Sequence, residues 1–354
     1  FDKGMKAAIE NRYVQPLGQS YTQNGVTLRL HYLIADDLRV VFFFNLDGVG
    51  EEEDIYLRIA RISEKGKTQQ LPCMISSTGL KYQPEEVKTL VVDFSGGVLT
   101  PSSLTVDFEV VRESGPGGGK GEILASFRSE ISQVERYAPK TYELMEDFFV
   151  EGQRFTMEKV VVCPTLTQIS VSCAPENTAY LTGMGLRIVD GKGEVWDGSV
   201  SGVSAVYNQD GKNISEIYLQ SSYFAPSKKM RLVLEEISLL PKDEEFVTVD
   251  LKAKTASPLP KQIRLAGVEV NGEQAQLCFV KDDDGSPRIH EIFGGVYYDA
   301  AGNRREFHHS GSSSRADGSF DQTFSVVPGG DLVVLQRVWG VPHSLKDALE
   351  FVLE

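Results

Sequence analysis

Short runs in which apolar and polar residues alternate recur along most of the chain. In Thr105–Val111 and again in Ile123–Ile131 about every second residue is apolar, which is the period of a half-buried strand. The longest apolar run, Val40–Phe44, is bounded by polar residues and is far shorter than the ~18 residues of a membrane-spanning helix. The pattern therefore predicts a protein built almost entirely of β-strands.

One segment near the start of the chain favours a helix instead. Asp2–Asn11 opens with an aspartate suited to an N-cap and contains the good helix formers Met5, Ala7 and Ala8. We expect a single short N-terminal helix followed by strands.

Turn residues and prolines recur with nearly fixed spacing, which predicts three copies of one β module. Three sets of positions define the repeat: a first turn near Asp37, Pro164 and Gly272; a glycine closing a second turn 29, 29 and 30 residues later, at Gly66, Gly193 and Gly302; and a later proline, at Pro101, Pro226 and Pro328. A glycine that closes a type I turn supplies φ > 0, and a proline between strands ends their pairing. The units are too long for a solenoid, so separate sandwiches are expected.

The fold prediction is thus all-β: three tandem immunoglobulin-like β-sandwich modules preceded by a short N-terminal helix. The predicted boundaries are 1–14 for the helix and lead-in, 15–140 for the first module, 141–256 for the second and 257–354 for the third. Phe246–Leu251 is expected to be the last strand of the second module, followed by the linker Lys254–Pro260. In the tail, Ser344–Glu350 fits a helix with a serine cap, but the repeat favours Leu349–Leu353 as the closing strand of the third module.

Composition and charge narrow the classes of partner. The 354 residues are 41% hydrophobic and 24% charged, which is typical of a folded domain protein. The formal net charge of −14 argues against a nucleic-acid partner and against electrostatic docking on anionic lipid. Because the chain starts at Phe1 rather than Met, we expect it to be part of a longer protein.

The four cysteines are expected to be free thiols. Cys163 and Cys173 form the only local pair, and a tight hairpin at Thr165 would hold them roughly 20 Å apart at the rise of a strand. Cys73 and Cys278 lie in other modules, and the absence of a CxxC or Cys/His quartet in the sequence argues against a structural zinc site.

No catalytic, cofactor-binding or metal-binding residue is predicted, and no cofactor. His31 lies in an alternating strand, and His308 and His309 are neighbours on an extended chain whose side chains point in opposite directions. Glu51–Asp54 is expected to be a solvated loop, and Lys281–Gly285 lacks the distal glutamate of a calcium loop.

Three further features were weighed against simpler interpretations. Trp196, Trp339, Tyr297 and Tyr298 are more readily explained as covers of sandwich cores than as a sugar platform. Gly115–Gly121 lacks the helix and the hydroxyl residue of a phosphate loop, and Asn213-Ile214-Ser215 matches a glycosylation acceptor by composition alone. A pair of acids suited to glycoside hydrolysis stays open, because their separation in space is invisible in the sequence.

Two stretches resemble known domains. Tyr13–Pro16 followed by Asn24–Leu28 resembles the start of an uncharacterised extracytoplasmic domain of single-pass, anti-sigma-factor-like membrane proteins of Gram-positive bacteria. Gly152–Val160 followed by Cys163–Thr167 is similar to the β domain that follows it there. The resemblance implies a transmembrane helix before Phe1, and it transfers architecture and location but no active site.

The functional expectation is a non-enzymatic extracytoplasmic sensor or interaction ectodomain of a membrane-anchored regulator, located at the cell surface. Its partner would be a protein or a cell-envelope ligand, with the membrane reached only through a segment outside this chain. The alternatives are a carbohydrate-binding or adhesive surface module and, less favoured, a glycoside hydrolase-type enzyme.

Overall fold

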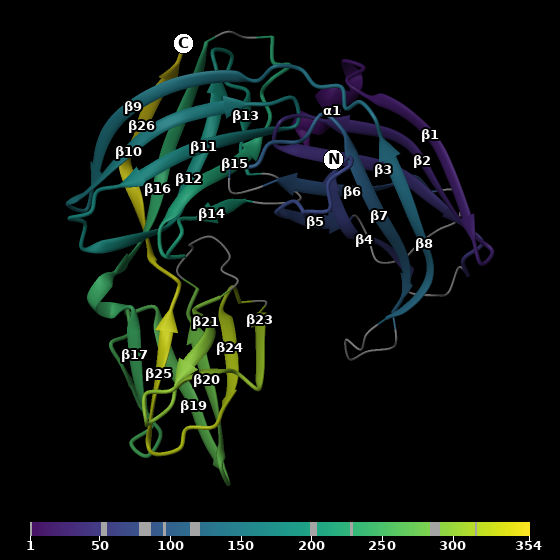
Figure 1. Ribbon diagram of the computed structural model, residues 1–354. Coiled ribbons are helices and arrows are strands. Elements are labelled where there is room, and N and C mark those ends of the chain that lie inside the picture. Colours follow the sequence, from purple (N-terminus) through teal and green to yellow (C-terminus); the bar gives the residue numbers. More distant parts are fainter. Residues whose placement is uncertain are drawn as a thin grey trace.

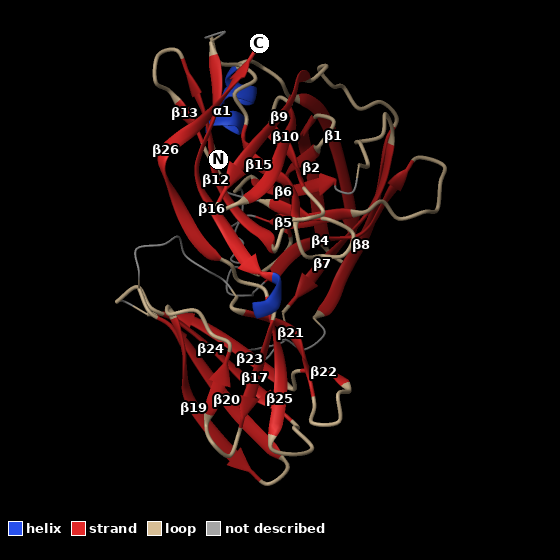
Figure 2. Ribbon diagram, turned by 90° about the vertical axis from the view of Figure 1, so that its left-hand side faces the viewer, coloured by secondary structure: helices blue, strands red, loops and turns tan. Residues whose placement is uncertain are grey.

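A computed structural model describes residues 2–50, 55–77, 86–94, 97–113, 121–198, 204–226, 229–283, 291–315 and 317–354. In these residues the chain is nearly all β, with one α-helix at the N-terminal end and one 3₁₀ turn (Figure 2). The elements are α1 (Lys3–Glu10), β1 (Gln15–Gln23), β2 (Val26–Ala35), β3 (Arg39–Asp47), β4 (Ile55–Glu64), β5 (Cys73–Ser77), β6 (Lys88–Phe94), β7 (Leu104–Arg112), β8 (Glu122–Ile131), β9 (Lys140–Val150), β10 (Gln153–Val162), β11 (Leu166–Cys173), β12 (Ala179–Asp190), β13 (Val195–Trp196), β14 (Ala205–Tyr207), β15 (Ile214–Gln220), β16 (Met230–Pro241), η1 (Lys242–Glu244), β17 (Phe246–Asp250), β18 (Thr255–Ser257), β19 (Ile263–Asn271), β20 (Gln274–Lys281), β21 (Phe293–Tyr298), β22 (Arg304–Glu306), β23 (His309–Ser314), β24 (Phe320–Val326), β25 (Leu332–Arg337) and β26 (Val341–Leu353).

The strands form three antiparallel sandwiches (Figure 1). In the first, sheet β1-β2-β3-β6-β5 faces sheet β4-β7-β8; in the second, β14-β15-β11-β10-β9 faces β13-β12-β16-β26; in the third, β19-β20-β24-β23 faces β18-β17-β25-β21-β22. Each contains the four-plus-three arrangement of an immunoglobulin constant-type domain, with one or two added strands. Each also has its own apolar core, so the predicted fold class is confirmed.

The predicted repeat is confirmed for its turns and for the strands that these turns join. The first turns join β2 to β3, β10 to β11 and β19 to β20, and the prolines precede β7, β16 and β25. Gly193 and Gly302 follow β12 and β21 with φ of 85° and 81°. In both turns an aspartate, Asp190 or Asp299, organises the backbone. Its carbonyl accepts the amide of the closing glycine, and its side-chain Oδ1 accepts the amides of the residues just before and just after that glycine. The shared turn explains why the glycine spacing survives sequence divergence.

Replacing either turn glycine tests this conformational role. Gly193→Val should cost about 1–3 kcal/mol of unfolding free energy, because a β-branched residue at φ > 0 is strained. A β-carbon at Gly193 would have no heavy atom within 4 Å, so the loss would be conformational rather than steric. Lys192→Val, one residue earlier in the same turn, should cost much less. Chemical denaturation compares the two, and equal losses would show that the glycine does not anchor the turn.

The second and third sandwiches have exchanged their closing strands relative to the sequence prediction. The closing strand is the last strand of the repeat, which pairs with the strand that follows the proline. In the first sandwich β8 follows β7 and pairs with it. In the second, however, the strand that pairs with β16 is not the next one, β17, but the C-terminal β26. Strand β17 pairs instead with β25 of the third sandwich. The predicted boundaries 141–256 and 257–354 are therefore wrong at these ends, and Leu349–Leu353 is a strand, as favoured, but of the second sandwich.

The exchange creates one long antiparallel ribbon that passes through both sandwiches. On one side β16 continues through η1 into β17, and on the other β25 continues into β26. Pairing runs from Met230↔Leu353 to Leu239↔Val341, resumes at Phe246↔Gln336 and ends at Asp250↔Leu332. Both crossings between the sandwiches lie in the short gap between these stretches, so the third sandwich is an insertion in the second.

The structure also decides two smaller predictions, one at each end of the chain. The N-terminal helix is confirmed, with the Asp2 side chain accepting the amide of Met5 at 2.9 Å. The helical alternative for Ser344–Glu350 is wrong, because that stretch lies in β26. The expectations for Glu51–Asp54 and for nearly all of Gly115–Gly121 fall outside the described residues.

All four cysteines are free, as expected. Cys173 lies opposite Phe155, and a bulge between Met157 and Lys159 shifts the register of β10 within this hairpin. Burial raises the pKa of the Cys163 thiol and raises the pKa of Cys173 to about 11, which keeps both thiols protonated and unreactive at neutral pH.

Mass spectrometry can count the free thiols directly. Alkylation of the denatured, unreduced protein should add four labels, one for each cysteine. Two labels or fewer would reveal a bridge and would contradict the register of the β10–β11 hairpin.

Candidate functional site

The first and second sandwiches meet through a buried carboxylate. Asp36, in the turn between β2 and β3, is fully buried and receives the amides of Leu38 and Arg39, each at 3.0 Å. Its other oxygen receives both the amide and the hydroxyl of Thr165, each at 2.7 Å, from the equivalent turn of the second sandwich. Burial raises the pKa of Asp36, while the hydroxyl and amide of Thr165, the Leu38 amide and the charge of Arg39 act against that rise. The two repeated hairpin turns are thus fastened to each other.

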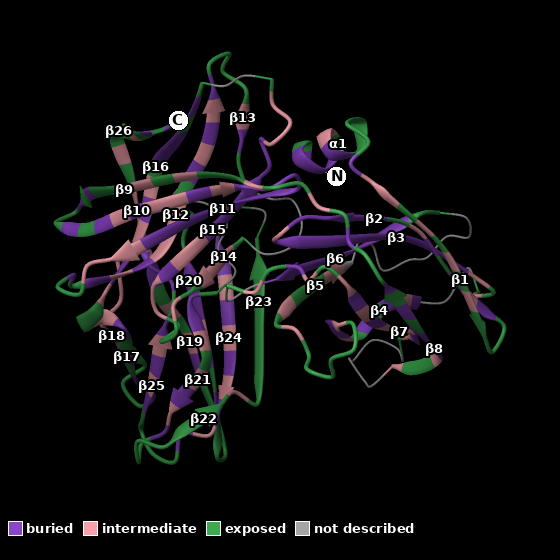
Figure 3. Ribbon diagram, turned by 45° about the horizontal axis from the view of Figure 1, so that its top comes forward, coloured by how far each residue is buried: buried purple, intermediate pink, exposed green. Residues whose placement is uncertain are grey.

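Helix α1 and an aromatic group complete this interface. The helix packs on the outer face of β3 and β6, so these strands are buried on both sides (Figure 3). Gly4 allows the helix to approach the second sandwich closely, since a β-carbon there would lie 2.7 Å from the Ser221 amide nitrogen. The ring of Tyr13 lies 4.4 Å from that of Tyr137 and 6.1 Å from that of Phe224, centroid to centroid. Apolar burial and hydrogen bonds from several elements make the first two sandwiches one unit.

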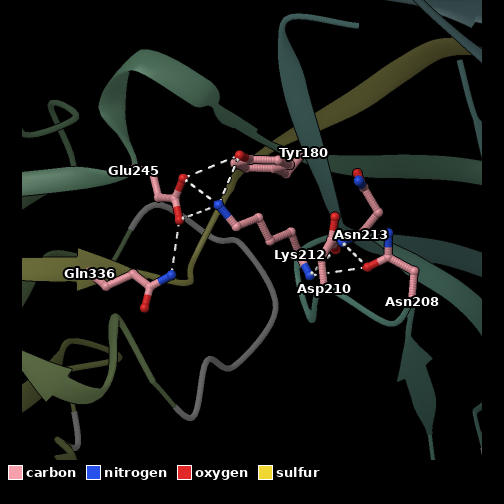
Figure 4. Close-up of polar contacts among 7 residues, drawn as sticks. All are labelled: Tyr180, Asn208, Asp210, Lys212, Asn213, Glu245 and Gln336. Atoms are coloured by element: carbon pink, nitrogen blue, oxygen red, sulfur yellow. Dashed lines mark hydrogen bonds and ion pairs between the residues drawn. The ribbon is translucent and has the colours of Figure 1, made fainter. Parts of the chain in front are cut away.

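The junction of the second and third sandwiches is built differently, around Glu245 (Figure 4). This residue lies between η1 and β17, and its carboxylate receives Lys212 Nζ at 2.9 Å, Tyr180 Oη at 3.2 Å and Gln336 Nε2 at 2.9 Å. Lys212 also donates to Tyr180 Oη at 3.1 Å. Glu245 is 5% exposed, and its hydrogen bond raises the pKa of Lys212. One charged cluster therefore joins β12 and a turn of the second sandwich to β25 of the third.

A local turn places Lys212 at this junction. Asn208 Oδ1 accepts the amides of Lys212 at 3.2 Å and Asn213 at 3.1 Å, and Gly211 closes the turn with φ of 72°. Asn213 Oδ1 in turn accepts the amide of Leu181 at 2.8 Å. The side chain of the possible glycosylation acceptor is thus half-buried and engaged in positioning the turn, which argues against modification of the folded protein.

Arg337, at the end of β25, adds contacts where the chain passes between the second and third sandwiches. Its amide donates to the Glu245 carbonyl at 2.7 Å, and Nη1 donates to Glu244 Oε2 at 3.0 Å. The residue is 1% exposed, and burial lowers the pKa of its guanidinium. Its Nε and Nη2 have no hydrogen-bond partner in the described structure. A buried charge that is only partly paired contributes little net stability.

A cleft of about 620 Å³ flanks the same junction. Its lining includes Glu236 and Tyr207 of the second sandwich and Glu291 and Trp339 of the third. Burial raises the pKa of Tyr207, and the nearby charge of Glu291 adds to that rise. The structure therefore brings two carboxylates and two rings from different sandwiches to one concave surface, a common place for a ligand.

The histidines and acidic runs singled out in the sequence form no site of their own in the described structure. His31 Nε2 lies 2.8 Å from Asn45 Oδ1, and His309 is exposed in the edge strand β23. The described residues contain no group of three or more metal-binding side chains. Lys281 donates to the Asp282 carbonyl at 3.2 Å, while the end of Lys281–Gly285 lies outside the described residues.

The four rings considered as a sugar platform are distributed over separate places. Trp196 belongs to the core of the second sandwich, and Tyr297 and Trp339 belong to that of the third. Tyr298 meets Phe246 edge-on at 6.0 Å between centroids. They cover cores and edges, as the simpler interpretation expected, and only Trp339 also borders the cleft.

No sequence pattern marks the junction residues themselves. Tyr180, Lys212, Glu245 and Gln336 come from four elements, and none lies in a recognisable motif. Glu245 ends the acidic run Asp243–Glu245, which alone resembles a solvated turn. Only the exchanged ribbon brings Gln336 beside Glu245, so the cluster follows from the topology.

Two stretches of the chain match families whose function is unknown. Residues 139–263 match the model of a family of unknown function (DUF5643), and residues 1–48 match that of a domain of unknown function (DUF4179). No curated protein matches the chain. A solved structure, described as the conserved domain protein from Bacillus anthracis, is 14% identical and aligns with a TM-score of 0.43 over 69% of this chain and 84% of that one. Among the described residues, no helix is long and apolar enough to cross a membrane.

Proposed function

We propose that this chain is a non-enzymatic extracytoplasmic sensor or interaction ectodomain of a membrane-anchored regulator. The observation that carries the proposal is that the chain forms two parts: the first and second sandwiches together, and the third sandwich. The first and second sandwiches share a buried interface, whereas the third is inserted through two adjacent crossings held by the cluster at Glu245. The third sandwich also lies far from both marked chain ends (Figure 1).

This arrangement suits the reporting of an event outside the cell. A ligand that contacts both the second and third sandwiches favours one angle between them, and the shared ribbon transmits a change of angle into the core of the second. The resemblance to anti-sigma-factor-like membrane proteins supports an anchor before Phe1. With that anchor, the third sandwich would be the part most distant from the membrane.

Labelling of intact cells tests the location. Ser313→Cys introduces a thiol in the exposed strand β23, in the full protein produced by its own host. A maleimide that does not cross membranes should label this variant in intact cells. The parent chain, which keeps its four native cysteines, is the control. Labelling of Ser313→Cys only after lysis would refute the proposed location.

A carbohydrate-binding surface role is the second candidate, favoured by the cleft that Trp339 and the two carboxylates share. Calorimetric titration with neutral oligosaccharides tests it, with Glu291→Gln as the variant that should weaken binding. Chromatography of the recovered sugar separates binding from hydrolysis: cleaved products lost in Glu236→Gln or Glu291→Gln would favour a glycoside hydrolase. No heat of binding at any accessible concentration would dismiss both roles.

A further inference from the structure

The edge of β16 that faces away from β12 has two candidate partners within the same chain. In the first sandwich the equivalent edge, on β7, pairs with the strand that follows directly, β8. The strand that follows β16 directly is β17, yet β16 pairs with β26 from the C-terminal end. The same holds for β25, which is followed directly by β26 but pairs with β17.

Both strands alternate apolar and polar residues as a closing strand must, but they cover different parts of β16. Phe351 and Leu353 lie opposite Leu232 and Met230, whereas β17 would reach only the end of β16 at Ile237 and Leu239. A closing strand must present large apolar side chains to the core at every second residue. In β17 these are Val247 and Val249, each fully buried, and in β26 they are Phe351 and Leu353, exposed by 4% and 2%. Short links, residues 242–245 and 338–340, separate each strand from the one before it, so each pair of consecutive strands is short enough to form a local hairpin.

The family comparison points to the same alternative. The unit matched by the family of unknown function spans residues 139–263, which includes β17 and ends long before β26. The matched stretch therefore contains β17 but not β26, the strand that pairs with β16 in this structure.

We propose that the edge of β16 is a strand-acceptor site that takes either of two strands, β26 as observed or β17. The class of ligand is an extended peptide with large apolar residues at alternate positions. With β26 bound, the third sandwich is docked on the second by the ribbon. With β17 bound, each sandwich is closed by its own hairpin and the third is tethered only by the chain after β17. The proposal goes beyond the proposed function and does not depend on where the protein is located.

The register of the alternative pairing follows from the core. Ile237 and Leu239 face the core of the second sandwich, so Val249 and Val247 must lie opposite them if they are to face it too. Ser238 and Thr248 would then be direct partners. In the structure Ser238 pairs with Pro342, and Thr248 pairs with Val334. Ser238 and Thr248 are ten positions apart along the chain, on either side of η1 and in different sandwiches.

Disulfide trapping in the full chain tests the exchange. Ser238→Cys/Thr248→Cys cannot close a bridge unless β17 moves onto β16, because a disulfide requires α-carbons within about 7 Å. Thr248→Cys/Val334→Cys, a pair already in register, is the positive control. Thr182→Cys/Lys192→Cys is the matched negative control, because these residues are also ten apart, along β12 and into its turn, and can meet only if that strand unravels. Peptide mapping after mild oxidation identifies the bridges.

We expect the Ser238–Thr248 bridge to form at least about tenfold faster than the Thr182–Lys192 bridge under native conditions, because exchange requires only partial opening. Equal rates would mean that the bridge forms through global unfolding and would overturn the proposal. If the Ser238 variant folds poorly, a second variant replaces it. In Arg231→Cys/Val352→Cys a disulfide would tie β26 to β16, and its hydrogen exchange is measured. Its oxidised form should slow amide exchange in β17 as well as in β26, and slowing confined to β26 would overturn the proposal.

Discussion

Phe351→Ala should lower the unfolding free energy by about 3–5 kcal/mol and should damage the second sandwich rather than the third. The side chain is 4% exposed, and its ring meets that of Phe148 edge-on at 5.7 Å between centroids. Truncation would leave a cavity among residues that belong to β9, β10 and β16, whose surroundings are fixed by the rest of the sandwich. Chemical denaturation measures the total loss.

Hydrogen exchange then shows which sandwich has been weakened. Protection should fall in β11 and β12 of the second sandwich before it falls in β20 and β24 of the third. Val352→Ala is the matched control, because the neighbouring side chain is 52% exposed on the opposite face of the strand and should change stability by no more than about 0.5 kcal/mol. A loss of protection confined to the third sandwich would contradict the exchanged topology.

Much of the fold was predictable from the sequence because local rules determine it. A period of two marks the strands, and glycines at Gly66, Gly193 and Gly302 mark a turn that needs φ > 0, with observed values of 83°, 85° and 81°. These constraints act within a few residues, so they are visible in one copy of the repeat and recognisable in all three. The seven-strand topology then follows from the resemblance of each copy to the others.

The exchange of closing strands could not be predicted by the same reasoning. Phe246–Asp250 and Val341–Leu353 each follow a core strand after a short link, and each alternates apolar and polar residues near its buried end. Local pattern fits both pairings, and the choice between them depends on the whole junction, including the contacts of Glu245 and Arg337. The candidate site at Glu245 could not be predicted from local patterns either, since its residues meet only after the ribbon has formed.

The Asp36 interface illustrates a second kind of feature that sequence patterns miss. Asp36 lies in the first turn, where its side chain accepts the amides of Leu38 and Arg39, as an aspartate in a turn commonly does. The structure shows that its second oxygen is used by Thr165 of another sandwich, 129 positions further along the chain. A residue that satisfies a local rule thus carries a long-range role that the local rule does not reveal.

Asp36→Ala should lower the unfolding free energy by about 3 kcal/mol or more, because it leaves several buried donors without an acceptor at once. The amides of Leu38, Arg39 and Thr165 and the Thr165 hydroxyl would lose their acceptor in a site from which water is excluded. Asp37→Ala is the matched control: its carboxylate pairs with Arg136 at 3.1 Å near the surface, where such a pair contributes about 1 kcal/mol or less. Chemical denaturation measures both losses, and small-angle scattering shows whether the first and second sandwiches separate only in the Asp36 variant. If both variants lose the same stability and keep the same dimensions, the buried carboxylate does not hold the two sandwiches together.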